Sequence, residues 1–256
     1  MNFFSLIGVE LKKIRRSKIL WILLIPIVLL WIPAVINADI NFTMQPEGIS
    51  PENNFLVQSF MGLSWFMYPA SLVICTVLLN QTEKSNNGIL KMLSLPINKV
   101  HLCLAKFVVL LLLAAFQMVM MIVMYFLSAA IASSLQNYQF ILPPSIVLKE
   151  SILVYLSSIP MAAIYWMLAT CIQTPIFSVG IGLATIVPSI LAINTSVWFV
   201  YPMCYPFVII TAEMHKLAAN MGTYQYELFP WLPIAIAISI ICLTVSCIRF
   251  GQVERS

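Results

Sequence analysis

Side chains that could do chemistry are few in this 256-residue chain, and they are scattered. Its two histidines, His101 and His215, pair with no carboxylate on one helix face at the spacing of metal ligands. The six cysteines form no C-x-x-C pair, and the eight glycines include no G-x-x-x-x-G-K-[ST] phosphate loop. The sequence therefore predicts no catalytic residues, no metal site, no disulfide and no nucleotide bound by this chain.

One polar stretch has an ordered pattern, NQTEKSNNGILKMLSLPINKVHLCLAK, which runs from Asn80 to Lys106. Gly88 allows a close turn, and Pro96 ends a short helix because it lacks an N–H and restricts the residue before it. The residues between them supply an apolar anchor, and charged residues surround it as a polar rim. The anchor is Ile89, Leu90, Met92 and Leu93, and the rim is Glu83, Lys84, Lys91 and Lys99. Each of these features by itself also fits an ordinary solvated loop with basic residues on the cytoplasmic side.

The elements that hold this segment are predicted from composition. The chain is 61% hydrophobic and 9% charged, with a mean hydropathy of +0.98, which excludes a water-soluble domain. About 20 apolar residues are needed for a helix to cross the bilayer. Six runs of about that length occur, at 19–36, 55–79, 107–133, 152–172, 176–194 and 231–248. They are apolar on every face, so we expect an all-α membrane bundle rather than a barrel.

Lysine and arginine in the connections predict the orientation of the spans. Lys149 and Lys216 fall on one side, and the other eleven of the 13 basic residues fall on the opposite side. The majority side should be cytoplasmic, which places both termini and residues 81–100 there.

Two further segments flank the spans. Residues 1–18 place Phe4, Ile7, Leu11 and Ile14 at helical spacing, with Glu10 and a set of basic residues largely around them. We expect an interfacial amphipathic helix, with a topogenic charge cluster as the equal alternative and a secretory signal disfavoured by the long following run. Residues 196–230 contain an apolar stretch that is short and broken by Pro202 and Pro206, so we expect a re-entrant or interfacial hairpin followed by a short surface helix.

The ordered pattern of the polar stretch resembles the segment between the second and third membrane helices of ABC-2-type permeases. The matching residues are Glu83, Gly88, Lys91, Leu93, Ser94, Pro96 and Lys106. The resemblance implies the type-2 ABC exporter fold, in which residues 1–18 form an elbow helix, residues 81–100 a coupling helix and residues 196–230 a re-entrant helical hairpin.

What the resemblance implies about partners follows from that fold. Two separate ATPase subunits would bind ATP and Mg, and a second permease, identical or related, would complete the pathway. Small outer loops and a basic elbow resemble permeases of lantibiotic-immunity and antimicrobial-peptide exporters. This implies a multi-pass protein of a bacterial plasma membrane that moves hydrophobic or amphipathic peptides, with no nucleic-acid partner.

Two stripes of residues are candidates for the substrate path. The second span carries Gln58, Met61 and Trp65, and the third carries Gln117, Met121 and Met124, on one helix face each. Methionine and aromatic surfaces can adapt to varied apolar ligands, although helix packing also produces such stripes.

Two other functions are also compatible with the sequence. One is a secondary carrier or channel, which is disfavoured because the six runs contain no charged residue or histidine. The other is an ATP-independent immunity or scaffold protein that sequesters a peptide.

The orientation can be tested by labelling. We expect a cysteine placed at Lys91 to react with a membrane-impermeant maleimide only in inside-out vesicles, because the lysine-rich side faces the cytoplasm. A cysteine at Lys216 should react only in right-side-out vesicles. Labelling of position 91 from outside would refute the topology.

Overall fold

The computed structural model describes residues 3–15, 17, 19–84, 98–172, 174–220, 222, 224 and 226–252, and these residues contain helices and no strand. Six helical segments within them are long and apolar enough to cross a membrane. They are Ile19–Ile36, Pro51–Gln81, Lys99–Gln136, Pro144–Cys171, Pro175–Ala192 and Leu228–Phe250. The predicted all-α bundle with six spans is therefore confirmed.

The first part of the chain forms two helices, α1 (Phe3–Arg15) and α2 (Ile19–Ile36). α2 has the bounds that the sequence predicted. The chain then continues through the 3₁₀ helix η1 (Ala38–Glu47), which ends at Gly48 in a left-handed conformation with φ 78°. A Cβ at Gly48 would lie 2.8 Å from the Cβ of Ala219, so both the backbone angle and the space favour glycine there.

The second span is a continuous helix with one wide turn. α3 (Pro51–Gly62) passes through a π-helical turn (Leu63–Met67) into α4 (Tyr68–Lys84). The backbone N–H of Tyr68 bonds to the carbonyl of Leu63, five residues back. Because Pro69 has no N–H to donate, the ladder is already interrupted at this point, and a π turn accommodates the interruption.

The third span is longer than hydropathy predicted. α6 (Lys99–Gln136) begins eight residues before position 107, the expected start. The Asn98 side chain accepts a hydrogen bond from the backbone N–H of Val100 at 2.9 Å, which caps the helix. Cys103, which precedes the expected start of this span, is consequently part of α6, and its side chain is buried.

The fourth span is broken in the middle. α7 (Pro144–Ser157) and α8 (Ile159–Cys171) meet at Ser158, two residues before Pro160. α9 (Pro175–Ala184) and α10 (Ser189–Ala192) make up the fifth segment, with turns at 185–188 where the sequence predicted one unbroken helix.

The segment before the last span differs from the expected layout. After short 3₁₀ turns at Trp198–Val200 and Pro202–Cys204, a single helix α11 (Tyr205–Leu217) joins part of the apolar stretch to the expected surface helix. Pro206 lies in the first turn of α11, where its missing N–H is tolerated, rather than breaking it. α11 packs on α7 and α3, so its first half is buried.

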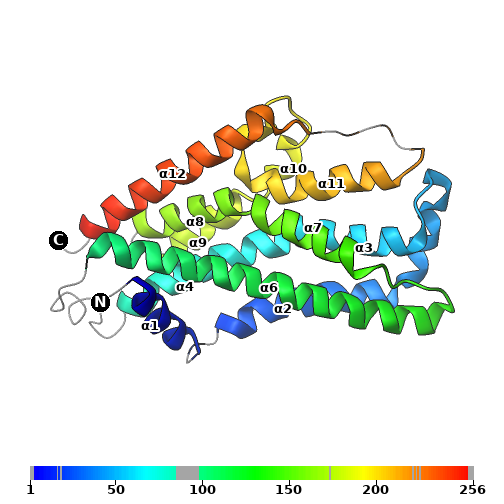
Figure 1. The fold of residues 1–256 in the computed structure, drawn as a ribbon, viewed down its shortest axis with the longest axis horizontal. Coiled ribbons are helices and arrows are strands. Elements are labelled where there is room, and N and C mark those ends of the chain that lie inside the picture. Colours follow the sequence, from blue (N-terminus) through cyan, green and yellow to red (C-terminus); the bar gives the residue numbers. More distant parts are fainter. Residues whose placement is uncertain are drawn as a thin grey trace.

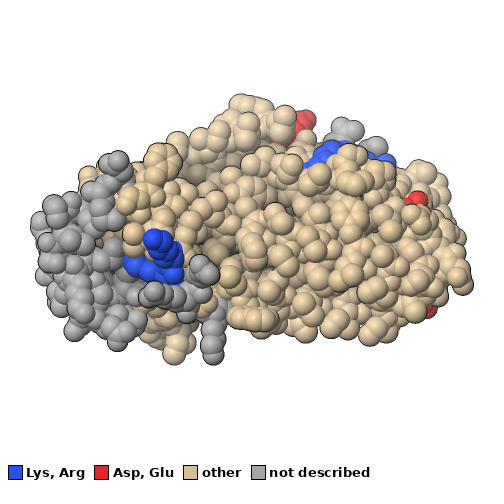
Figure 2. All heavy atoms as spheres, turned by 60° about the horizontal axis from the view of Figure 1, so that its bottom comes forward, with Lys and Arg blue, Asp and Glu red and all other residues tan. Residues whose placement is uncertain are grey.

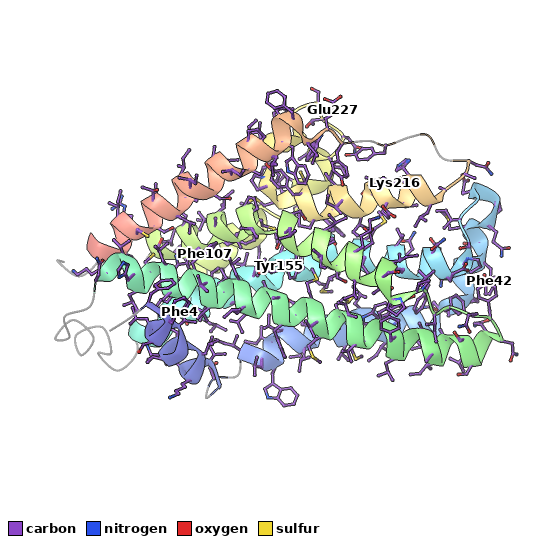
Figure 3. The ribbon with its side chains drawn as sticks, viewed as in Figure 1. Phe4, Phe42, Phe107, Tyr155, Lys216 and Glu227 are labelled. Carbon is purple, nitrogen blue, oxygen red and sulfur yellow. The ribbon has the colours of Figure 1, made fainter. Side chains whose placement is uncertain are left out.

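The last helix, α12 (Leu228–Gln252), crosses the bundle beside α8 (Figure 1). Phe229 has non-helical angles, φ −106° and ψ 127°, so the regular helix starts close to the expected Trp231. α1 and the last turns of α12 lie at the end of the bundle where α4 ends and α6 begins (Figure 1). Phe42 of η1 lies at the opposite end (Figure 3).

On the face shown in Figure 2, charged residues are absent from a broad band. Figure 2 shows a broad band without charges between basic residues near one end and charged residues of both signs toward the other. Large apolar side chains are exposed within the spans, including Ile25, Leu127 and Ile240. Such a surface suits the hydrocarbon of a bilayer.

Close packing of α9 on α4 gives a stability prediction. A Cβ at Gly182 would lie 2.6 Å from Cγ1 of the Val73 side chain. We expect Gly182→Ala to lower the free energy of unfolding by about 1–3 kcal/mol, because the β-branched Val73 must shift. The thermal unfolding midpoint in detergent measures this.

Gly180 on the same helix is the matched control. An added Cβ there meets nothing within 4 Å among the described residues. Gly180→Ala should leave the midpoint unchanged or raise it, since alanine favours helix over glycine. Equal midpoints for the two variants would contradict the packing of α9 on α4.

Candidate coupling site

The predicted coupling segment is bracketed by α4 and α6. Glu83 and Lys84 belong to the last turn of α4, and Lys99 is the first residue of α6. The other predicted coupling residues, Gly88, Leu90, Lys91, Leu93 and Pro96, lie outside the described residues, as do the side chains of Glu83 and Lys84. The described part of the site therefore consists of the two helix ends that flank the segment, the end of α4 and the beginning of α6.

α1 lies against the beginning of α6. Leu6 of α1 is buried in one cluster with Leu102 and Ala105 of α6, and the ring of Phe3 lies 6.3 Å from that of His101. Residue numbers in the two helices increase together along this contact, so α1 runs parallel to the first turns of α6.

One turn further along the same seam, a buried ion pair joins the two helices. The Lys106 ammonium donates to Oε2 of Glu10 at 2.8 Å, and the side chains are 0% and 2% exposed. The ammonium also donates to the backbone carbonyl of Leu79 in α4 at 3.2 Å. A second lysine, Lys13 of α1, donates to the other oxygen of Glu10. The ammonium of Lys106 thus joins α6, to which it belongs, to both α1 and α4.

The electrostatics of this pair favour the charged carboxylate. Burial alone raises the pKa of Glu10, but attraction to Lys106 and hydrogen bonds from Lys106 and Lys13 outweigh burial, so the pKa lies below its ordinary value. Removing one partner of a buried pair leaves an uncompensated charge and costs about 3–5 kcal/mol.

Sequence reasoning misplaced Glu10. We expected it among the charged residues around the apolar face of α1, whereas it is 1% exposed and faces α6. Spacing carried a signal that would have located it. Leu6, Glu10 and Ile14 follow one another at i, i+4, so they share a helix face, and all three are buried.

The candidate substrate residues have different surroundings. Gln117 donates to the Ser71 hydroxyl at 2.9 Å, and the sulfur of Met121 accepts from the Trp31 indole at 3.1 Å. Both are buried in helix contacts with α4 and α2. Met61, Trp65 and Met124 are half-buried and Gln58 is exposed. The substrate role of these six residues stays a prediction.

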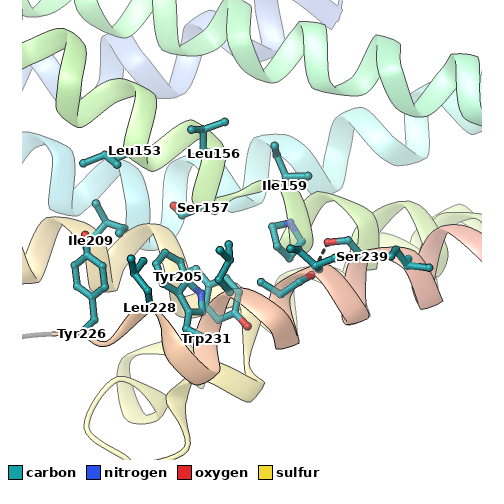
Figure 4. A pocket seen from close by; sticks show the side chains of 15 residues that line it. Leu153, Leu156, Ser157, Ile159, Tyr205, Ile209, Tyr226, Leu228, Trp231 and Ser239 are labelled. Carbon is teal, nitrogen blue, oxygen red and sulfur yellow. Dashed lines mark hydrogen bonds between the residues drawn. The ribbon is translucent and has the colours of Figure 1, made fainter.

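An apolar cavity of about 500 Å³ lies elsewhere, where α7 and α12 diverge (Figure 4). Its buried floor includes Tyr205 and Ile209 of α11, and exposed walls are formed by Leu156 of α7 and Leu232 and Ile236 of α12. This volume is in the range of small-molecule pockets. No residue pattern in the sequence pointed to it, because its lining comes from four separate elements.

At the other end of the bundle, charges join α7 to α11. Lys149 lies 3.1 Å from Glu150 and 3.5 Å from Glu213, and Lys216 lies 3.4 Å from Glu213. Lys216, labelled on α11 in Figure 3, also lies over the Tyr226 ring, 5.9 Å from its centroid. Both lysines are more than half exposed, so these contacts add little stability.

Helical spans, a charge-free surface band and a buried charge cluster at one end define a polytopic membrane protein. The family model described as "ABC-2 family transporter protein" matches residues 6–189. The match covers more than half of the chain and extends from α1 to the start of α10. The chain belongs to this family, and it is therefore a membrane permease component of an ABC transporter that works with an ABC ATPase. No curated protein and no solved structure matches the chain.

The ion pair makes stability depend on pH. Because the folded pKa of Glu10 lies below the ordinary value of 4.5, its contribution is present above that value and is lost as the pH falls through the folded pKa. We expect Glu10→Gln to lower the unfolding free energy at neutral pH by about 3–5 kcal/mol and to lose less than the wild type on acidification. Thermal unfolding midpoints in detergent across pH measure both effects.

Glu47→Gln is the control, since Glu47 is exposed in η1. It should keep both the neutral midpoint and the acid profile of the wild type. A Glu10→Gln variant with the acid profile of the wild type would show that the ion pair does not contribute.

Proposed function

We propose that this chain is the permease of an ATP-driven exporter that moves hydrophobic or amphipathic peptides out of a bacterial plasma membrane, as in lantibiotic immunity. ATP and Mg bind to two copies of a separate ATPase subunit. A second permease, identical or related, completes the pathway, and both termini of each copy are cytoplasmic.

The observation that carries the proposal is the continuity of the family match across α4, residues 85–97 and α6. The segment expected to bind the ATPase is therefore flanked by α4 and α6, and both helices belong to candidate membrane spans. α6 has 38 residues, about 57 Å at 1.5 Å per residue, which exceeds the hydrocarbon thickness. A displacement at its first turn is carried through the membrane because the helix is continuous.

The apolar cavity between α7 and α12 supports hydrophobic or amphipathic peptides as the cargo. Tyr205, Ile209 and Trp231 line it together with leucine and isoleucine side chains of α7 and α12, which are membrane-spanning segments. A polar or charged cargo would lose its hydration on such a surface without compensating hydrogen bonds. The apolar face of an amphipathic peptide has no such hydration to lose.

ATPase retention tests the proposal. We expect the tagged wild-type permease to co-purify with an ABC ATPase, and Glu83→Lys or Leu93→Asp to release it while membrane insertion persists. Loss of an interface anchor of at least about 2 kcal/mol weakens binding by roughly 30-fold. ATP-dependent accumulation of a labelled lantibiotic in inside-out vesicles should fall with the same variants.

Glu227→Lys is the matched control, because it makes the same charge change at an exposed position beside the start of α12, away from the ends of α4 and α6 that flank the coupling segment. It should retain the ATPase. Equal retention by Glu83→Lys and the wild type would reject the coupling assignment. Accumulation of the peptide without ATP would favour a secondary carrier, and binding without accumulation would favour a sequestering immunity protein.

A further inference from the structure

Lys106 connects the three elements around the coupling segment. Its nitrogen lies 2.8 Å from the carboxylate of Glu10 in α1 and 3.2 Å from the carbonyl of Leu79 in α4, and Lys106 itself belongs to α6. α4 and α6 are the helices that flank residues 85–97. A movement of these helix ends therefore acts directly on α1.

The attachment of α1 has more than one point. The apolar cluster of Leu6 with Leu102 and Ala105 holds the first half of the helix, and Ile14 at its end is buried in the main core. Glu10 lies between these two contacts on the same face. α1 is thus held against the bundle along its length rather than by its tip.

α1 is in turn joined to the first span by a short connection. α1 ends at Arg15 and α2 begins at Ile19. The hydroxyl of Ser17 donates to the carbonyl of Ile14 at 2.8 Å and accepts from the backbone N–H of Ile19 at 3.4 Å. A displacement of α1 is therefore passed to α2 across few residues.

A buried ion pair is an unusual way to attach a helix. Apolar side chains of similar volume are often as stabilising in such positions, and apolar contact is non-directional. An ammonium that donates to both a carboxylate and a carbonyl allows little movement of one helix along the other, because hydrogen bonds weaken steeply with distance and angle. The pair therefore sets the register of α1 on α6 more strictly than the apolar cluster does.

We propose that Glu10 and Lys106 are positioning residues of the transport cycle. They hold α1 on the ends of α4 and α6 as one rigid unit, so that movement of the coupling segment is delivered to α1 and the first span α2 as well. This inference rests on the proposed function, and it adds the route by which the motion reaches a span that the coupling segment does not adjoin.

Distance measurements between spin labels test the rigid unit. One label is placed at Lys12 on α1 and one at Leu112 on α6, both exposed and away from the contact, in a chain whose six native cysteines are replaced. The co-purified complex with its ATPase is measured without nucleotide and with ATP and vanadate. We expect one narrow distance distribution that is the same in both states.

Three variants identify the ion pair as the cause. Glu10→Ala preserves helix propensity but removes the carboxylate, and we expect a distance distribution at least about twofold wider. Lys106→Arg keeps a cation with hydrogen-bond donors for both Glu10 and the Leu79 carbonyl, so it should retain the narrow distribution. Lys13→Ala, which removes the other cation bonded to Glu10 but leaves the Lys106 contact, should retain it.

ATP hydrolysis and peptide accumulation separate a positioning role from a merely structural one. Glu10→Ala should retain the ATPase and hydrolyse ATP within about twofold of the wild-type rate while accumulation falls at least about tenfold, and Lys106→Arg should keep the wild-type accumulation. If Glu10→Ala lost ATPase binding, hydrolysis and accumulation together, or if Lys106→Arg behaved like Glu10→Ala, the positioning role would be refuted.

Failure of the proposed function would look different. A wild-type permease that retains no ATPase contradicts the proposed function. A wild-type complex that retains its ATPase but changes the distance between α1 and α6 with nucleotide contradicts the rigid unit alone.

Discussion

Hydrocarbon offers no hydrogen-bond partner to a polypeptide, and this constraint shapes the whole molecule. Every span is helical because only a helix pairs its own N–H and C=O groups. Polar side chains inside the spans follow the same requirement. The hydroxyls of Ser71, Ser239 and Ser246 each donate to the carbonyl four residues back, at 2.7 Å. These three serines are therefore satisfied within their own helices.

Prolines disturb this local pairing, and the fold absorbs each disturbance differently. Pro69 follows a π turn that keeps the second span continuous, whereas Pro160 follows a break that separates α7 from α8. At Pro206 the helix simply starts, so the missing N–H costs nothing. The second and third of these sites lie at the apolar cavity, whose lining includes Pro160 and Tyr205.

A full charge is harder to accommodate than a hydroxyl, and Lys106 shows how the chain manages one. No carbonyl of its own helix neutralises an ammonium, so the compensating carboxylate comes from α1, an element outside the six candidate spans. α1 can supply it because its buried face continues with Leu6 and Ile14 on either side of Glu10. Stability, placement of α1 and the proposed delivery of motion to α2 therefore depend on the same contact.

Composition and periodicity by themselves determined the helical class and the presence of six spans. Hydropathy placed the ends of α2 correctly but started the third span late, because a hydropathy window stops at Lys106 whereas the backbone ladder continues to the cap at Asn98. The grouping of Tyr205–Leu217 into one helix and the lining of the cavity depended on neighbours that no local pattern encodes. Only the tertiary structure decided that Glu10 faces Lys106, 96 residues away, since which helices become neighbours is set by the packing of the entire bundle.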